Sequence, residues 1–142
     1  MKRVIAFGTF DIFHPGHESF LKQAKKLGDF LVVVVARNNN VVSSKGNPPT
    51  NHEKSRVSSV RKANIADKVI LGSKTNNYFQ TLRTYKINII ALGYDQKPTI
   101  KELKKTLSRH RLSQVEIIRL NPYNPSKYKS SLLNNGLAHS KQ

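Results

Sequence analysis

The residue types best suited to chemistry lie in one short stretch, residues 8–17, with the sequence GTFDIFHPGH. This stretch holds two histidines in an HxxH spacing, His14 and His17, and one acid, Asp11. An apolar run precedes it, and a helical pattern follows it. Residues of these types at this spacing suit a phosphate site, a metal site, or a turn that the histidines only stabilise.

The phosphate-site interpretation depends on the backbone as well as on the histidines. Gly8 would end a strand and Gly16 would open a helix, and glycine allows the backbone to approach a ligand closely. Pro15 suits the first helical turn, whose unpaired N–H groups bind anions. His14 and His17 flank that turn, and each could donate an N–H to a phosphate oxygen. The chain contains no GxxxxGKS or GxxxxGKT loop and no GxGxxG turn.

A zinc site would need a third ligand besides the two histidines, from Asp11 or from elsewhere in the chain. The sequence has no HExxH segment and no cysteine, so the common zinc-ligand sets are absent. In the third alternative, His14 and His17 cap and pack the turn without taking part in chemistry. The residues alone leave these alternatives open.

Composition limits the class of protein. The chain has 142 residues, and we expect residues 1–137 to form one domain and residues 138–142 to be a frayed tail. Its 25 Lys and Arg against 8 Asp and Glu give a net charge of +17, which attracts nucleotides, nucleic acid or anionic lipid. The absence of cysteine excludes a disulfide scaffold. No apolar run is long enough to cross a membrane, so we expect a cytoplasmic protein.

Apolar segments of strand length alternate along the chain with segments of helical periodicity. This order is typical of an α/β fold, here a Rossmann-like, doubly wound sheet of about five parallel strands with helices on both faces. The expected strands are 3–7, 30–36, 68–71, 88–92 and 114–120. The expected helices are 17–27, 52–63, 76–85 and 99–110, with a short helix after the loop that starts at 121.

Polar segments that follow the strands should meet at one edge of the sheet. In open parallel sheets, ligands bind beyond the carboxyl ends of the strands, where the chain order reverses. Four polar or glycine-bearing segments follow expected strands, at 8–17, 37–51, 93–98 and 121–131, and we expect them to build one site. The second contains Gly46, two prolines and three consecutive asparagines, a composition that suits a mobile gate.

Several of these segments resemble a known family. GTFD at 8–11, followed by HPGH at 14–17, is similar to the signature of the cytidylyltransferase-like nucleotidyltransferases. KGNPPTNHEKSRVSSVR resembles the lysine loop and arginine-bearing helix of that family, IIALGYDQ resembles the loop after its fourth strand, and YKSSLL resembles its terminal serine helix. The resemblance spans residues 3–133.

Within that family, KGNPP, LGYDQ and YKSS are most similar to the archaeal-type FAD synthase subgroup. The glycerol-3-phosphate cytidylyltransferase pattern differs, because its terminal segment carries an arginine that NPSKYKSSLL lacks. The resemblance implies transfer of AMP from ATP to FMN with release of pyrophosphate, assisted by Mg²⁺. CTP with glycerol 3-phosphate, or with another phosphorylated small-molecule acceptor, is the alternative. Members of the family are commonly homodimers.

The resemblance also implies roles for particular residues. The catalytic group consists of His14, His17, Lys45 and Arg56. The nucleotide-binding group consists of Gly8, Thr9, Phe10, Asp11, Gly16, Gly93, Asp95, Ser130 and Ser131, with Asp11 also a candidate metal contact. Stacking faces at the border of the acceptor pocket could come from Tyr94, Tyr123 and Tyr128. Lys45 could instead be a solvated lysine, Arg56 a member of a surface pair, and the serines ordinary N-caps.

Two other classes of protein are consistent with such a fold. A net charge of +17 suits a nucleic-acid-binding protein, but the aromatic residues lack RNP-like spacing and no helix-turn-helix pattern is present. The third class is a regulatory nucleotide binder without catalysis. The presence of both histidines together with Lys45 and Arg56 argues against that class.

Overall fold

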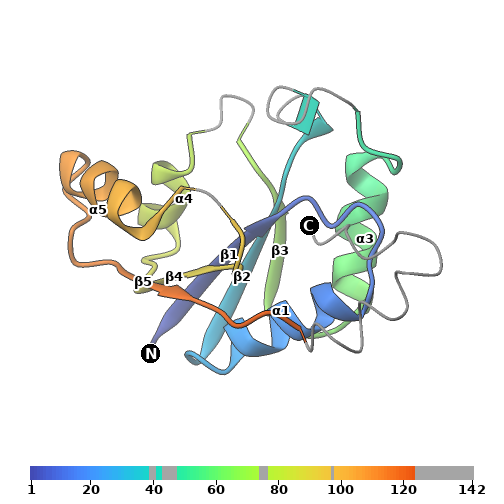
Figure 1. Cartoon of the computed structure of the whole chain (residues 1–142), viewed down its shortest axis with the longest axis horizontal. Helices are drawn as coiled ribbons and strands as arrows, with labels where there is room; N and C mark the ends of the chain where they lie inside the picture. The colour runs from blue at the N-terminus through green and yellow to red at the C-terminus, as the bar shows by residue number, and fades with distance from the viewer. Residues whose placement is uncertain (39–40, 43–47, 74–76, 97, 124–142) are drawn as a thin grey trace.

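The computed structural model describes residues 1–38, 41–42, 48–73, 77–96 and 98–123. They form a five-stranded parallel sheet with helices on both faces, which confirms the predicted fold class (Figure 1). The strands are β1 (Arg3–Gly8), β2 (Phe30–Val35), β3 (Lys68–Leu71), β4 (Ile89–Leu92) and β5 (Glu116–Arg119). The helices are α1 (Pro15–Lys25), α3 (Glu53–Lys62), α4 (Phe79–Thr84) and α5 (Ile100–Arg109).

The strand order is β3-β2-β1-β4-β5, and every neighbouring pair is parallel. The chain therefore builds outwards from β1 as far as β3, and then adds β4 and β5 on the other side of β1. The direction in which strands are added reverses between β1 and β4. The loops that follow two such strands diverge, and a crevice for a ligand lies between them. This topology places the expected site beyond Gly8 and Leu92, the last residues of β1 and β4.

The side chains of β1 alternate between the two faces of the sheet. Val4 and Ala6 belong to the buried cluster that contains α1 and α3 side chains. Ile5 belongs to the buried cluster that contains α4 and α5 side chains, and Phe7 packs against that second cluster. In Figure 1, α4 and α5 accordingly lie to the left of the sheet, and α1 and α3 lie to the right and below. Because both faces are covered, the central strands are apolar at consecutive positions.

Some boundaries differ from the sequence prediction. α1 begins at Pro15 rather than at residue 17, because His14 caps it. α4 has only six residues, starting at Phe79. Asn38 and residues 41–42 are helical within the segment predicted as a loop, because Val41 is apolar and packs into the interior. The predicted C-terminal helix lies outside the described residues. Across the described ranges, no helix has both the length and the apolar character to cross a bilayer.

Gly28, between α1 and β2, lies directly against the N-terminal strand. A Cβ at this position would be 2.7 Å from the carbonyl oxygen of Lys2 and 2.9 Å from Cγ2 of Val4. We expect Gly28→Ala to lower the free energy of unfolding by about 1–3 kcal/mol, as overpacking usually does. Urea unfolding measures this, with Gly72→Ala as the control, because a Cβ at Gly72 meets its neighbours at 3.4 Å or more. Equal stability of the two variants would contradict the expectation.

Candidate active site

Two histidine side chains cap the N-terminus of α1. His14 is the N-cap residue, and its Nδ1 accepts a hydrogen bond from the backbone N–H of Gly16 at 3.0 Å. Nδ1 of His17 accepts a hydrogen bond from the backbone N–H of His14 at 3.3 Å, which completes a reciprocal capping box. Pro15 lies in the first turn, as the sequence predicts. The HxxH spacing therefore has a structural role at the start of the helix.

These capping hydrogen bonds determine where the proton of each neutral ring lies. Because Nδ1 accepts a hydrogen bond, the proton of the neutral imidazole must be on Nε2. The two rings stack with their centroids 3.8 Å apart, and the buried ring of His17 also lies edge-on to Phe10 at 5.3 Å. Each histidine therefore carries an Nε2–H donor at a helix N-terminus. Capping the turn and donating to a phosphate are compatible functions of the same ring.

The Arg56 side chain, which is 1% exposed, links three segments of the chain. Its Nε donates to the carbonyl oxygen of Asn51 at 3.0 Å. One terminal nitrogen donates to the carbonyl oxygen of Thr9 at 2.8 Å, and the other donates to Oδ1 of Asn38 at 2.7 Å. The surface-pair interpretation of Arg56 is therefore wrong. The guanidinium joins the loop after β1, the segment after β2 and the start of α3.

The Thr9–Phe10 peptide has a fixed orientation as a result. In a trans peptide the N–H points opposite to the carbonyl, so the Phe10 N–H points away from the guanidinium that holds the Thr9 oxygen. Phe10 has a φ of 52°, a conformation that non-glycine residues adopt only where their surroundings enforce it, and its side chain is fully buried. Arg56 and the packing of Phe10 together hold this amide in place.

Asp11 connects the same loop to the start of α3. Its Oδ2 and Oδ1 accept hydrogen bonds from the backbone N–H groups of Thr50 and Asn51, each at 2.8 Å. The side-chain amide of Asn51 in turn donates to the carbonyl oxygen of Asp11. Burial lowers the pKa of Arg56, and the carboxylates of Asp11 and Glu53 oppose this shift. In the described part of the chain, no group of three or more His, Asp or Glu side chains is arranged to hold a metal.

A second polar network organises the loop after β4. Oε1 of Gln96 accepts a hydrogen bond from the N–H of Gly93 at 2.7 Å, and its Nε2 donates to the carbonyl oxygen of Phe7 at 2.8 Å. One terminal nitrogen of Arg119 donates to the carbonyl oxygens of Gly93 and Gln96, at 2.9 and 2.7 Å. Neither Gln96 nor Arg119 is among the residues predicted from the sequence. The only signal was the place of Gln96 in the LGYDQ segment.

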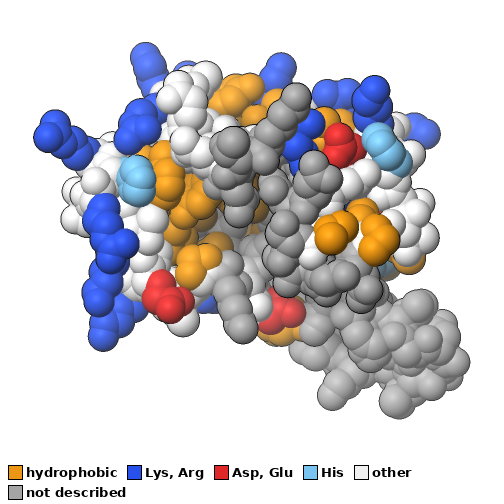
Figure 2. Space-filling model, turned by 90° about the horizontal axis from the view of Figure 1, so that it is seen from above, with side chains coloured by type: hydrophobic (Ala, Val, Ile, Leu, Met, Phe, Trp, Pro, Cys, Tyr) orange, Lys and Arg blue, Asp and Glu red, His pale blue; other side chains and the backbone are white. Residues whose placement is uncertain are grey.

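The described candidate residues after β1 and β4 lie at the carboxyl edge of the sheet, as predicted (Figure 1). Hydrogen bonds join the loop after β1 to the start of α3, and Gln96 joins it to the loop after β4. On that second loop, Asp95 and Tyr94 are exposed. Seen from above, this face shows apolar side chains in its middle, with Lys and Arg side chains along its left and upper margins (Figure 2).

The remaining candidates come from the segment after β5 and from undescribed parts of the chain. Tyr123 is half-buried after β5. The start of its segment is fixed by two hydrogen bonds between the side chain of Gln23 and the backbone of Asn121, at 2.9 and 3.0 Å. The other candidates lie outside the described residues; they are Lys45, Tyr128, Ser130 and Ser131.

A family model for cytidylyltransferase-like proteins matches residues 5–135, nearly the whole chain. The chain belongs to the cytidylyltransferase-like family. The FAD synthase of Aciduliprofundum boonei is 44% identical to this chain over 89% of the chain and 83% of that protein. The FAD synthase of Archaeoglobus profundus is 43% identical over 92% of this chain and 82% of that protein. The family and subgroup resemblances seen in the sequence are therefore confirmed.

Two solved structures are similar to this chain in fold. A protein of Thermoplasma volcanium described as a lipopolysaccharide core biosynthesis protein is 40% identical, with a TM-score of 0.80 over 87% of this chain and 99% of that one. A pantoate-beta-alanine ligase from Francisella tularensis is 15% identical, with a TM-score of 0.60 over 92% of this chain and 65% of that one. The second likeness shows a shared fold alone.

Proposed function

We propose that this nucleotidyltransferase transfers the AMP group of ATP to the phosphate of FMN, which releases pyrophosphate and forms FAD. The observation that carries the proposal is a helix N-terminus capped by two histidines, in a chain that is similar to FAD synthases over most of its length. The N–H groups and dipole at such a helix start favour phosphate. The net charge of +17 favours both anionic substrates.

The reaction joins two phosphates. An oxygen of the acceptor phosphate attacks the α-phosphorus of the nucleotide, and a new P–O bond forms. The bond from the α-phosphorus to the oxygen that bridges to the β-phosphorus breaks, and its electron pair leaves with pyrophosphate. Because the acceptor phosphate is already anionic near neutral pH, no strong base is needed. Catalysis then depends on positioning the two phosphates and on stabilising negative charge in the transition state.

The residues beside α1 supply these functions. His14 and His17 would donate through Nε2–H to the reacting phosphate. The Phe10 N–H, held by the hydrogen bond from Arg56 to Thr9, would donate to a second phosphate oxygen. Arg56 would therefore act as a positioning residue, because each of its three guanidinium nitrogens donates to a protein oxygen.

Mg²⁺ would neutralise charge on the triphosphate during the reaction. This ion keeps several waters and binds through substrate phosphates with one or two carboxylates, so it needs no cage of protein ligands. Asp11 could supply such a carboxylate, because it stands at the loop that would carry the phosphates and is held there by the N–H groups of Thr50 and Asn51.

Residues away from the start of α1 would also contact the nucleotide. Lys45 would approach the triphosphate, and Ser130 and Ser131 would bind its β- and γ-phosphates. The loop of Gly93 and Asp95 would contact the base and ribose, since Gln96 and Arg119 hold that loop beside the end of β1. 

Chromatographic separation of flavins tests the function directly. The purified protein is incubated with FMN, Mg²⁺ and each of the four nucleoside triphosphates, and in parallel with CTP and glycerol 3-phosphate. FAD formed with ATP, together with one pyrophosphate per FAD, is the expected result. Formation of CDP-glycerol with no flavin dinucleotide from any triphosphate would overturn the proposal. Gel filtration of the same preparation tests the homodimer that the family resemblance implies.

A further inference from the structure

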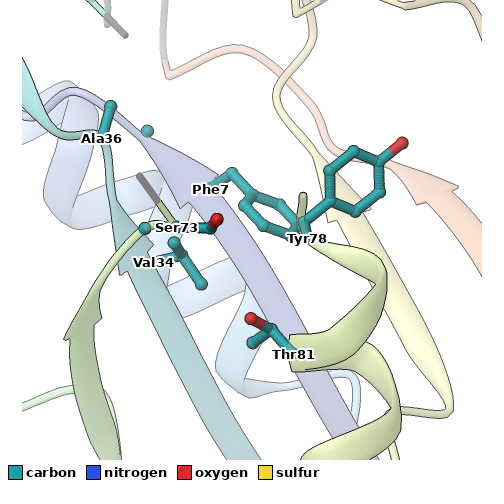
Figure 3. A pocket seen from close by; sticks show the side chains of 8 residues that line it. Phe7, Val34, Ala36, Ser73, Tyr78 and Thr81 are labelled. Atoms are coloured by element: carbon teal, nitrogen blue, oxygen red, sulfur yellow. The ribbon is translucent and has the colours of Figure 1, made fainter. Parts of the chain in front are cut away.

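An apolar cleft lies on the face of the sheet that α4 covers. It is next to the loop between β1 and α1, residues 9–14, which we call the phosphate loop because it would carry the phosphates. A hollow of about 130 Å³ opens at the carboxyl ends of β1, β2 and β3, where Phe7, Val34 and Gly72 line it. Figure 3 shows Phe7 and Tyr78 on one side of this hollow and Val34 and Ser73 on the other, with Thr81 below them. A second hollow of about 230 Å³ adjoins it and shares Phe7 and Tyr78 as its wall.

The shared wall consists of two aromatic rings in contact. Phe7 and Tyr78 meet edge to face, with ring centroids 5.5 Å apart and an interplanar angle of 67°. Tyr78 is partly exposed, and it precedes α4 without making a side-chain capping hydrogen bond. Neither hollow alone has the volume of an ordinary pocket for a cofactor-sized ligand, which is roughly 300 Å³ or more. A rotation of the Tyr78 side chain would join them.

Within the described residues, no charged side chain lines either hollow. The lining is aromatic and aliphatic, with the hydroxyl-bearing side chains of Ser73 and Thr81 in the first hollow and the amide-bearing Gln96 in the second. Such a lining suits a flat, uncharged heteroaromatic ring that has an apolar body and a polar edge. The anionic part of such a ligand would find its donors elsewhere, at the start of α1.

We propose that this cleft holds the ring of the acceptor, the flavin ring of FMN, and that the ring of Tyr78 turns to stack on it. Gly8 lines the first hollow and also begins the loop that leads to His14, so the ring site and the phosphate site meet at the end of β1. This inference rests on the proposed function and names the residues that select its acceptor: Phe7, Gly72, Tyr78 and Thr81.

Two substitutions narrow the cleft without touching the phosphate loop. Gly72→Ala adds a methyl group 3.4 Å from Cγ1 of Val34 and 3.6 Å from the carbonyl oxygen of Val35, which are ordinary contacts that the fold tolerates. Thr81→Leu adds a larger apolar group to the same lining. We expect each to raise KM for FMN roughly tenfold or more, with KM for ATP and the melting temperature unchanged, because small changes of shape in an apolar pocket have effects of this size.

A binding measurement without catalysis provides a second readout. Riboflavin has the flavin ring but no phosphate, and stacking on an aromatic side chain quenches its fluorescence. We expect the wild-type protein to quench riboflavin fluorescence, Tyr78→Phe to retain the effect, and Tyr78→Ser to lose most of it. Tyr85→Ser is the matched control, because Tyr85 lies at the opposite end of α4 and lines neither hollow. Tyr94→Ala tests the alternative acceptor border, because Tyr94 is an exposed tyrosine on the loop after β4.

The outcomes separate this inference from the proposed function. If the wild-type protein forms FAD but both cleft variants keep the wild-type KM for FMN, the ring site is wrong and the function stands. A rise in KM for FMN in Tyr94→Ala alone would also overturn it. If no FAD forms with any triphosphate, the proposed function fails, and quenching of riboflavin that Tyr78→Ser abolishes would still support the cleft as a ring site. Absence of both FAD formation and quenching would overturn both.

Discussion

Replacing His14 by asparagine is expected to lower kcat by about 10²–10³-fold while leaving the melting temperature close to that of the wild type. Asparagine is a favourable N-cap residue, so its Oδ1 would accept the Gly16 N–H that Nδ1 of His14 accepts in the wild-type protein. The variant lacks the Nε2–H donor and the stacking of the ring on His17, but it keeps the cap. It therefore separates the chemical function of the ring from its structural function, which an alanine variant would not do.

His17→Gln makes the same separation at the third residue of α1. Glutamine at this position completes a capping box in many helices, so it would accept the His14 N–H in place of the His17 ring. Pyrophosphate release at saturating substrates measures kcat, and thermal unfolding measures stability. His52→Asn is the control, because His52 caps α3 through Nδ1 and the Lys54 N–H at 3.2 Å. Turnover in His14→Asn equal to that of the control would mean that the ring only caps the helix.

Arg56→Lys is expected to lower the free energy of unfolding by about 2–3 kcal/mol and kcat by at least roughly tenfold. A lysine ammonium is compact and lacks the planar fork that reaches three separate oxygens, so at least one buried acceptor would lose its partner. Turnover falls because the Thr9–Phe10 peptide is no longer held, which misplaces a phosphate donor. Turnover is measured at a temperature where urea titration shows the variant fully folded.

Arg61→Lys is the matched control for this experiment. Arg61 lies on the same helix, and its side chain donates one hydrogen bond, to the carbonyl oxygen of Val69 at 3.1 Å. Lysine could replace that single bond at an exposed position, so stability and kcat should stay near the wild-type values. Wild-type kcat in fully folded Arg56→Lys would show that Arg56 stabilises the fold and does not position the site.

The alternation of strand and helix was predictable because it depends on local periodicity. The Val run of β2 and the amphipathic pattern of α5 each indicate their element without reference to the rest of the chain. Boundaries were less predictable where a side chain acts as a cap. His14 moves the start of α1 to Pro15 by accepting the Gly16 N–H, and histidine is not among the usual N-cap residues.

The candidate site was predictable where its residues are close in sequence. The segment from Gly8 to His17 carries both the glycines and the histidines, so its type and place could be inferred together. The hydrogen-bond partners of Arg56, Asp11 and Gln96 could not be inferred, because they are far away in the sequence. The bond from Arg56 to Thr9 spans 47 residues, that from Thr50 to Asp11 spans 39, and that from Gln96 to Phe7 spans 89. Residue spacing carries no information about such pairs.

The apolar cleft was missed for a different reason. Tyr78 fits the apolar side of a predicted helix, and Phe7 fits a buried strand, so neither residue indicates a ligand by its local pattern. Only the packing of α4 against the ends of β1–β3 leaves a hollow beside them. From the sequence, the acceptor is expected beside Tyr94, Tyr123 and Tyr128 in the predicted loops, because their rings could stack on it. The Tyr78 and Tyr94 variants test these two placements against each other.

The alternation of side chains along β1 has a consequence for which molecules the enzyme can accept. Phe7 faces the α4 side of the sheet, whereas α1, which the two histidines cap, packs on the opposite side. An acceptor that uses both must cross the carboxyl end of β1 at Gly8. Its ring and its phosphate must therefore be joined by a linker long enough for that crossing. With the ring in the proposed cleft and the phosphate at the start of α1, the width of β1 sets a minimum length for that linker. We therefore expect a heteroaromatic ring that carries its phosphate directly to be a poor acceptor, however well the ring itself would fit.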